Sequence, residues 1–287
     1  MSLRPAWSEA FAADRLQPVR PLPLPVAISP DWAFGTATGG GVTVAVVDSG
    51  VDGDHPLVGR VDGFAAFAID DGAPGGVRLD DGRHDDVVGH GTACAGIIRR
   101  IAPDVRLLSV RVLGERLSGR SAVFAAGLRW ALASGADVIS CSLSTSRPDN
   151  AAVFHEIADE AAHQGVVVVC AVNNVAGPSI PATFASVVSV AAHDGCDPWA
   201  WDANPRPPVD FGAPGIGIEV AWRGGGTVVT TGNSFAAPHV TAHVARLLSQ
   251  HPGLTTYEVK TVLRACARNA KTPDAERRPG SSTGAAV

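Results

Sequence analysis

Hydrophobic and polar positions divide the chain into segments of two alternating kinds. Short runs rich in β-branched and other apolar residues predict buried strands at residues 42–47, 106–112, 138–140, 166–171 and 187–191. Longer segments with helical patterns predict helices at residues 90–98, 121–134, 150–163, 234–250 and 256–269. Apolar strands that alternate with helices predict an α/β fold, a three-layer, mainly parallel β-sheet with helices on both faces.

The two ends of the chain lack this alternation. Residues 1–31 include the proline-punctuated stretch RPLPLPVAISP, and we expect them to form an N-terminal extension that runs extended over the surface. Residues 32–270 are expected to form one folded domain, and the Gly/Ser-rich residues 271–287 a disordered tail. The first residues lack a basic start followed by an apolar run, which predicts a cytoplasmic protein, or a secreted one if a leader has been removed.

Composition narrows the classes of partner. The 287 residues are 46% hydrophobic and 18% charged, which is typical of a chain with a large core. The 23 basic residues against 28 acidic ones leave no basic footprint, so no nucleic-acid partner is expected. The longest apolar stretch, residues 166–172, is far shorter than the ~20 residues of a membrane span, so none is expected.

The chain has five cysteines, and none has the C-x-x-C spacing of zinc or thioredoxin-like sites. Cys94, Cys141 and Cys170 lie inside apolar segments. We therefore predict small buried thiols in a reducing compartment.

Three motifs carry candidate chemistry, and the first is VAVVDSGVDGDHP. It places Asp48 at the end of a buried strand, where catalytic groups of open α/β sheets collect. A buried carboxylate needs a partner, and an imidazole N–H would supply one. Ordinary turn chemistry is the alternative interpretation of Asp-Ser-Gly.

The other two motifs lie at expected helix starts. In GHGTACAG, His90 stands between glycines that would allow close approach of another chain segment; a capping or core histidine is the alternative. In TGNSFAAPHV, Ser234 opens a helix whose free N–H groups favour negative charge; a plain N-cap serine is the alternative.

Together these motifs put Asp48, His90 and Ser234 in the order of one known catalytic triad. With all three in register, residues 32–270 resemble the subtilisin-type (subtilase) serine peptidases. The resemblance implies a subtilisin-like fold and peptide-bond hydrolysis through an acyl-enzyme, with Ser234 as nucleophile, His90 as base and Asp48 orienting the base. It implies a peptide or protein substrate, no cofactor and no metal in the reaction.

The resemblance also implies a substrate site. It gives the oxyanion hole the Asn174 side chain and the Ser234 N–H, with Asn173 as the neighbouring choice for the amide. An extended substrate would bind as an added strand against the residues of two edges and two pockets: Ser142, Leu143, Ser144, Leu117, Ser118, Gly119, Val88 and Val175. None of these side chains is charged, which favours apolar or small substrate residues.

The chain also departs from the family pattern. Ser144 replaces a usual glycine, which is expected to narrow the first specificity pocket, while Asn233 replaces threonine and Asn173 replaces glycine, changes that could perturb the oxyanion region. The loop that binds calcium in many members is missing, so no such calcium site is expected. The 47 residues before Asp48 leave no room for an inhibitory prodomain. Three alternatives follow: the chain folds without one, a separate activating or inhibitory partner supplies it, or it has been removed.

Several hypotheses therefore stay open. The leading hypothesis is an endopeptidase, and one role open to it is that of a dedicated protease that matures a precursor peptide. The rivals are an acyl transferase or ligase on the same triad, and a catalytically weak binding or scaffold protein.

Other polar features receive structural interpretations. The acidic cluster at residues 80–86 is expected to be a solvated loop, with a metal site or an attraction for basic substrates as alternatives. Surface or packing roles are expected for His84, His155, His163, His193 and His243.

Overall fold

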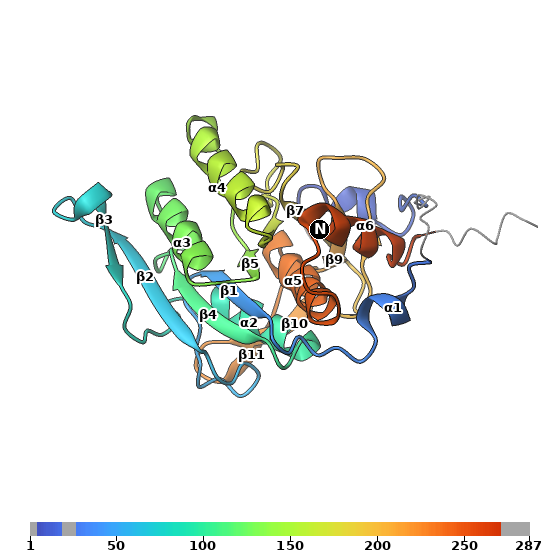
Figure 1. Ribbon diagram of the computed structural model, residues 1–287, viewed down its shortest axis with the longest axis horizontal. Helices are drawn as coiled ribbons and strands as arrows, with labels where there is room; N and C mark the ends of the chain where they lie inside the picture. The colour runs from blue at the N-terminus through green and yellow to red at the C-terminus, as the bar shows by residue number, and fades with distance from the viewer. Residues whose placement is uncertain (1–4, 19–26, 271–287) are drawn as a thin grey trace, which may run out of the picture.

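A nine-stranded, mostly parallel β-sheet crosses the computed structural model, which describes residues 5–18 and 27–270 (Figure 1). The strand order is β3-β2-β4-β1-β5-β6-β7-β9-β8, and only the outer pairs β2–β3 and β8–β9 are antiparallel. The strands are β1 (Thr43–Asp48), β2 (Gly63–Ile69), β3 (Val77–Asp80), β4 (Arg106–Arg111), β5 (Val138–Cys141), β6 (Val167–Ala171), β7 (Val188–His193), β8 (Asp202–Ala203) and β9 (Phe211–Pro214).

Helices cover both faces of this sheet (Figure 1). Alternate residues of β1 enter different cores, because successive side chains of a strand point to opposite faces. Val44 and Val46 pack with α2 (His90–Ile101) and α5 (Asn233–Gln250), while Ala45 and Val47 pack with α3 (Ser121–Ala133) and α4 (Ala151–His163). The short helices α1 (Pro30–Phe34) and α6 (Thr256–Ala265) join the core that contains α5. The three-layer α/β prediction is confirmed.

The predicted elements are present, with shifted ends. The helix predicted at residues 90–98 continues to Ile101, and the Arg99 guanidinium in its last turn donates to the carbonyl oxygens of Pro103 and Val105 just beyond it. The helix predicted at residues 256–269 ends earlier, and the Arg268 N–H donates to Trp201 O instead.

The sequence prediction missed six strands. The missed strands are β2, β3, β8, β9 and the antiparallel hairpin of β10 (Ile218–Trp222) and β11 (Gly226–Thr230). β3 and β11 are largely exposed and contain polar residues, so they lack the continuous apolar run that marks a central strand. β2 is apolar, but it consists largely of glycine and alanine, which are poor strand formers. The hairpin lies against the far side of α2, where Val220 joins a small cluster with Ile97.

Residues 5–17, which we call the N-terminal strap, differ from the expected surface path. The strap forms the 3₁₀ helix η1 (Ser8–Phe11) and buries Phe11, which is only 2% exposed. The Phe11 ring covers Gly212 of β9 so closely that a Cβ there would lie 2.4 Å from it. Burial of one aromatic side chain ties this segment to the core. The proline-rich residues 20–25 and the tail at 271–287 lie outside the described residues.

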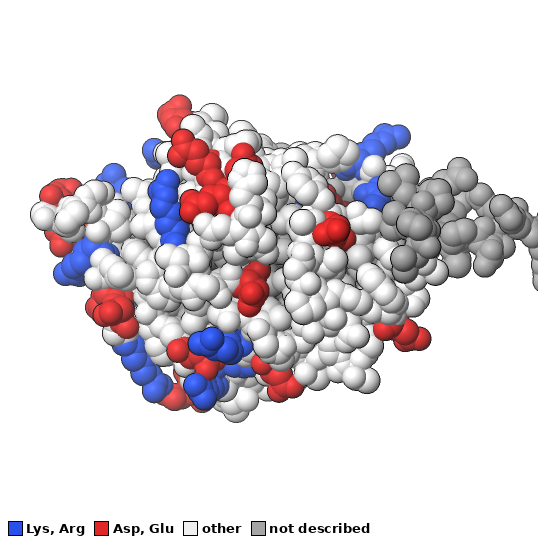
Figure 2. Space-filling model, viewed as in Figure 1, with Lys and Arg blue, Asp and Glu red and all other residues white. Residues whose placement is uncertain are grey.

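Surface charge and helix length concern two partners considered in the sequence analysis, nucleic acid and the membrane. On the face in Figure 2, basic and acidic side chains are interspersed among uncharged ones, without an extended basic area. Within the described ranges, no helix has the length and apolar character to span a bilayer.

Candidate active site

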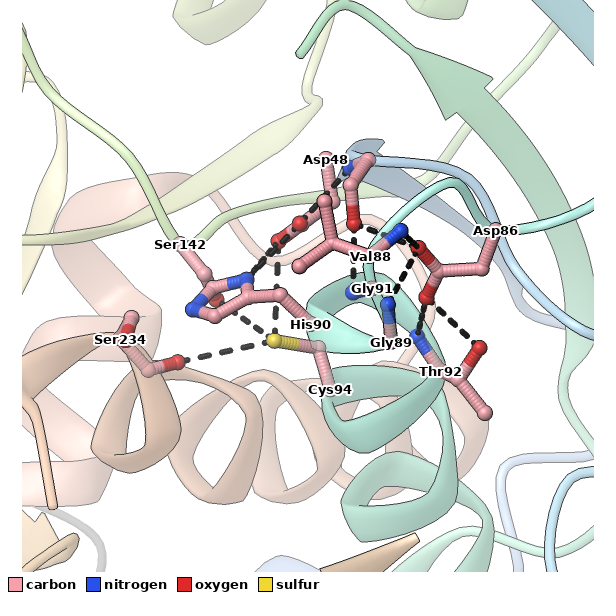
Figure 3. A network of polar contacts seen from close by, with 11 residues as sticks. Asp48, Asp86, Val88, Gly89, His90, Gly91, Thr92, Cys94, Ser142 and Ser234 are labelled. Carbon is pink, nitrogen blue, oxygen red and sulfur yellow. Dashed lines mark hydrogen bonds and ion pairs between the residues drawn. The ribbon is translucent and has the colours of Figure 1, made fainter. Parts of the chain in front are cut away.

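The three motif residues come from elements that meet at the carboxyl end of the central strands (Figure 3). Asp48 is the last residue of β1, His90 is the first residue of α2, and Ser234 lies in the first turn of α5. β1 lies between its parallel neighbours β4 and β5, which fixes the strand end in the middle of the sheet. The crossover connections of a parallel sheet bring such distant residues to one edge.

Asp48 and His90 form a buried pair. His90 Nδ1 lies 2.8 Å from Asp48 Oδ1 and 3.0 Å from Oδ2, and Asp48 Oδ1 also accepts from the Ser49 N–H at 2.7 Å. Burial opposes the charged form of His90, but the Asp48 carboxylate outweighs it, so the pKa of His90 lies well above its ordinary 6.5. With Nδ1 held by the carboxylate, Nε2 is the nitrogen left for proton transfer.

Close backbone approach at the glycines brings α2 onto the strand end. A Cβ at Gly91 would lie 2.0 Å from the Gly50 carbonyl oxygen, and one at Gly89 would lie 2.5 Å from the Trp222 ring. Gly89 also has a φ of 118°, which L side chains rarely adopt. The prediction that these glycines allow close approach is confirmed.

Asp86 was missed by the sequence analysis, which expected residues 80–86 to be a solvated loop. Its carboxylate is 3% exposed and accepts hydrogen bonds from the Gly89 N–H at 2.7 Å and the Thr92 N–H at 2.8 Å, groups at the start of α2 (Figure 3). It also accepts from the Ser49 hydroxyl at 2.8 Å. Asp86 thus fixes the helix start that carries His90 to the loop that follows Asp48. An acidic residue just before an expected helix start was the available signal.

A cavity of about 220 Å³ collects the remaining site residues. His90, Ser234 and Asn174 line it, together with Leu117, Ser142, Leu143, Ser144 and Asn173. Asn174 Oδ1 accepts from the Asn233 N–H at 2.8 Å, so the group that Asn174 offers to a bound molecule is its Nδ2 donor. A serine hydroxyl, an imidazole and an amide donor therefore line the same cavity.

Asn233 does not line this cavity but is buried next to residues that do. Its side chain is fully buried, its Oδ1 accepts from the Ala192 N–H at 2.9 Å, and its Nδ2 lies within hydrogen-bond distance of Val172 O and Asn173 O, at 3.2 and 3.1 Å. A threonine could not supply an acceptor and two donors from one planar group. The amide therefore ties the start of α5 to the chain segment that carries Asn174.

The proposed substrate residues are distributed around this cavity in different ways. Val175, which is 77% exposed, lines a neighbouring hollow of about 340 Å³ that shares Ser144, Asn173 and Asn174 with the first. The Ser144 hydroxyl donates to Asn173 Oδ1 at 2.7 Å. Three predicted substrate residues do not line either space: Val88, Ser118 and Gly119.

A thiol lies beneath the pair formed by Asp48 and His90. Cys94 Sγ is 3.7 Å from Asp48 Oδ2 and 3.2 Å from Ser142 Oγ. The ligand atoms of Asp48, His90 and Cys94 lie close enough together to hold a metal ion. Burial and the Asp48 charge raise the pKa of the Cys94 thiol, however, which disfavours the thiolate form that metals bind.

The other histidines and tryptophans lie away from the cavity. His193 and His243 are buried, His155 and His163 are exposed, and His84 Nε2 lies 2.9 Å from Ser109 Oγ. Trp201 is buried and donates its Nε1–H to Leu263 O at 2.9 Å, while Trp199 is 49% exposed.

Comparison with known proteins points to one family. The family model described as the subtilase family, Peptidase_S8, matches residues 39–282. Subtilisin E of Bacillus subtilis (strain 168) is 31% identical over 245 residues, which cover 80% of this chain and 61% of that protein. Subtilisin of Bacillus pumilus is also 31% identical over 245 residues, covering 80% of this chain and 85% of that protein. The crystal structure of a cold adapted subtilisin-like serine proteinase has a TM-score of 0.64 and 27% identity, over 88% of this chain and 89% of that one.

Proposed function

The chain belongs to the subtilase family of serine peptidases, and on that premise we propose that it is an endopeptidase that cleaves peptide bonds through an acyl-enzyme. The observation that carries the proposal is the buried pair of Asp48 and His90, whose histidine lines a cavity together with Ser234 and Asn174. A base held by a carboxylate next to a serine is the arrangement that activates a hydroxyl.

Each residue has one task in the proposed reaction. Ser234 Oγ attacks the substrate carbonyl while His90 Nε2 takes its proton, and His90 then returns that proton to the leaving amine. Asp48 holds the imidazole orientation and stabilises the imidazolium. The Asn174 Nδ2 and the Ser234 N–H donate to the oxyanion of the tetrahedral intermediate.

Intact-mass analysis after treatment with a fluorophosphonate probe tests this assignment. We expect a single adduct on the parent chain and none on the Ser234→Ala variant. Peptide hydrolysis should disappear with the same substitution, and products should carry a free carboxylate rather than an added amine. Folded parent protein that gains no adduct and cleaves no peptide would instead favour the binding or scaffold hypothesis.

We further propose that the first specificity pocket takes small residues. The hydrogen bond between Ser144 and Asn173 joins two residues that line both the cavity with Ser234 and the neighbouring hollow. A large side chain would have to break that bond and leave polar groups unpaired, at a cost of about 1–3 kcal/mol. In a series of peptides that differ only at the residue before the cleaved bond, glycine and alanine should give higher kcat/KM than leucine and phenylalanine.

A restricted pocket supports a processing role over general digestion. We propose that the chain matures a precursor peptide at a site with a small residue before the cleaved bond. A panel of unrelated denatured proteins tests this, because a dedicated enzyme should leave most of them intact. Rapid cleavage of the whole panel at many residue types would contradict the role.

For localisation we propose the cytoplasm. All five cysteines are free, and Cys94, Cys141 and Cys170 are buried. Unpaired thiols are typical of reducing compartments. Detection of the protein mainly in the culture medium of intact cells, rather than in the soluble cell extract, would contradict this proposal.

A further inference from the structure

We propose that the N-terminal strap, residues 5–17, acts through Ala6 as a positioning element for the oxyanion amide of Asn174. The inference rests on the proposed peptidase function, and it adds to that site a residue 168 positions away from the amide it would position. In this arrangement the strap touches no substrate. It positions the Asn174 side chain, which is proposed to contact the substrate.

The main chain of Ala6 makes both contacts. Its N–H donates to the Asn174 carbonyl oxygen at 2.7 Å, and its carbonyl oxygen accepts from Asn233 Nδ2 at 3.0 Å. Asn174 lies in an exposed loop, so its backbone would otherwise have few fixed neighbours on this side. The bond from Ala6 therefore restrains the residue whose side chain faces the cavity.

The contacts close a ring of hydrogen bonds. Ala6 binds Asn174 O, Asn174 Oδ1 accepts from the Asn233 N–H, and Asn233 Nδ2 returns to Ala6 O. The residue after Asn233 is Ser234, whose N–H is the second proposed donor to the oxyanion. Both proposed donors are thus held by one ring that includes the strap. A displacement of an oxyanion donor by about 1 Å can lower the reaction rate about 10²-fold.

The strap is anchored at two further points. Phe11 is buried over Gly212 and among the core residues beneath α3 and α4, and η1 packs against β7. Further along, the Asn269 Nδ2 donates to Gln17 O at 2.8 Å. Ala6 therefore belongs to a segment that is fixed to the core, and this segment contacts the loop that carries Asn174.

Truncation in two backgrounds tests the proposal. Removing residues 1–7 deletes Ala6 but keeps Phe11 as anchor, and we expect kcat for a good peptide substrate to fall about 10- to 100-fold with KM changed less than about 2-fold. In the Asn174→Ala background the same truncation should lower kcat by less than about 2-fold, because the group that the strap positions is already absent. Arg15 is an exposed strap residue, and Arg15→Ala is the matched control, which should leave kcat and KM unchanged.

The outcomes separate the inference from the proposed function. An equal fall of kcat in both backgrounds, or no fall in either, overturns the positioning role while the peptidase function stands. An inactive parent chain overturns both. Should the truncated protein fail to fold, as judged by near-ultraviolet circular dichroism, Ala6→Pro in the full chain removes the N–H that donates to Asn174 O and keeps the rest of the strap. The same loss and the same dependence on Asn174 are then expected.

Discussion

Replacing His243 with phenylalanine should remove much of the domain's sensitivity to acid. His243 lies in α5 against Trp201, at 4.4 Å between ring centroids, and is 2% exposed. Its Nε2 lies 3.3 Å from Pro198 O, and its Nδ1 has no hydrogen-bond partner among the described residues. Burial, helped by the nearby Arg246 charge, lowers the pKa of His243 from 6.5 to about 3.

The sign follows from proton uptake. Below pH 6.5 the unfolded chain protonates this histidine, whereas the folded chain does so only near pH 3, so the stability is complete above pH 6.5 and falls as pH drops from there towards 3. Each pKa unit corresponds to about 1.36 kcal/mol, and integration between pH 7 and pH 4 gives a loss of about 3 kcal/mol from this residue. His239, whose pKa burial lowers to about 4, acts in the same direction.

Urea unfolding at intervals between pH 7 and pH 4 measures the effect. The parent chain should lose about 3 kcal/mol more over this interval than His243→Phe, while the two should differ by about 1 kcal/mol at pH 7 because the lost hydrogen bond is long. His163→Gln, at an exposed position, serves as control and should keep the parental slope. Parallel stability curves for the parent and His243→Phe would refute the assignment of this acid sensitivity to His243.

Three further predictions concern the site. His90 must be neutral to act as base and Asp48 raises its pKa, so kcat/KM should fall on the acid side at a pH above 6.5. Asp48→Asn should move this acid limb to lower pH and reduce kcat by about 10⁴. An acid limb that does not move in the pH–rate profile would contradict this prediction. Ser144→Gly should raise kcat/KM for phenylalanine before the cleaved bond at least about 10-fold relative to alanine, measured with paired peptides, and an unchanged ratio would count against the narrowed pocket. Asp86→Ala should cost about 3–5 kcal/mol in the free energy of unfolding, because it leaves the buried start of α2 unpaired; a loss below about 1 kcal/mol in urea titrations would show that water replaces the carboxylate.

The sequence predicts best what short-range pattern controls. The apolar run before Asp48 and the small residues after His90 mark a buried strand and a tightly packed helix, and both are present. Asp86 escaped because charge counting takes a cluster of acidic residues to be solvated, whereas its neighbours at the helix start give it buried partners.

Long-range contacts were beyond any local pattern. The expectation that Asn233 perturbs the oxyanion region rested on its difference from a usual threonine, but nothing near it in the sequence indicates a partner 227 residues away at Ala6. Phe11 likewise lies in a segment without strand or helix periodicity, so no local pattern marks it as a core residue. Its burial depends on the absence of a side chain at Gly212, a position that only the folded sheet brings beneath it.

The shortness of the outer strands has a consequence for solubility. The nine-stranded sheet ends in β3, with four residues that include Arg78 and Asp80, and in β8, with two residues, where Asp202 pairs with Arg268. Long, uncharged edges act as templates for extended chains and lead to aggregation. A protein proposed to bind extended peptides benefits when its own sheet edges are too short to recruit them. Misdirected self-association through these edges should therefore be rare even at high concentration.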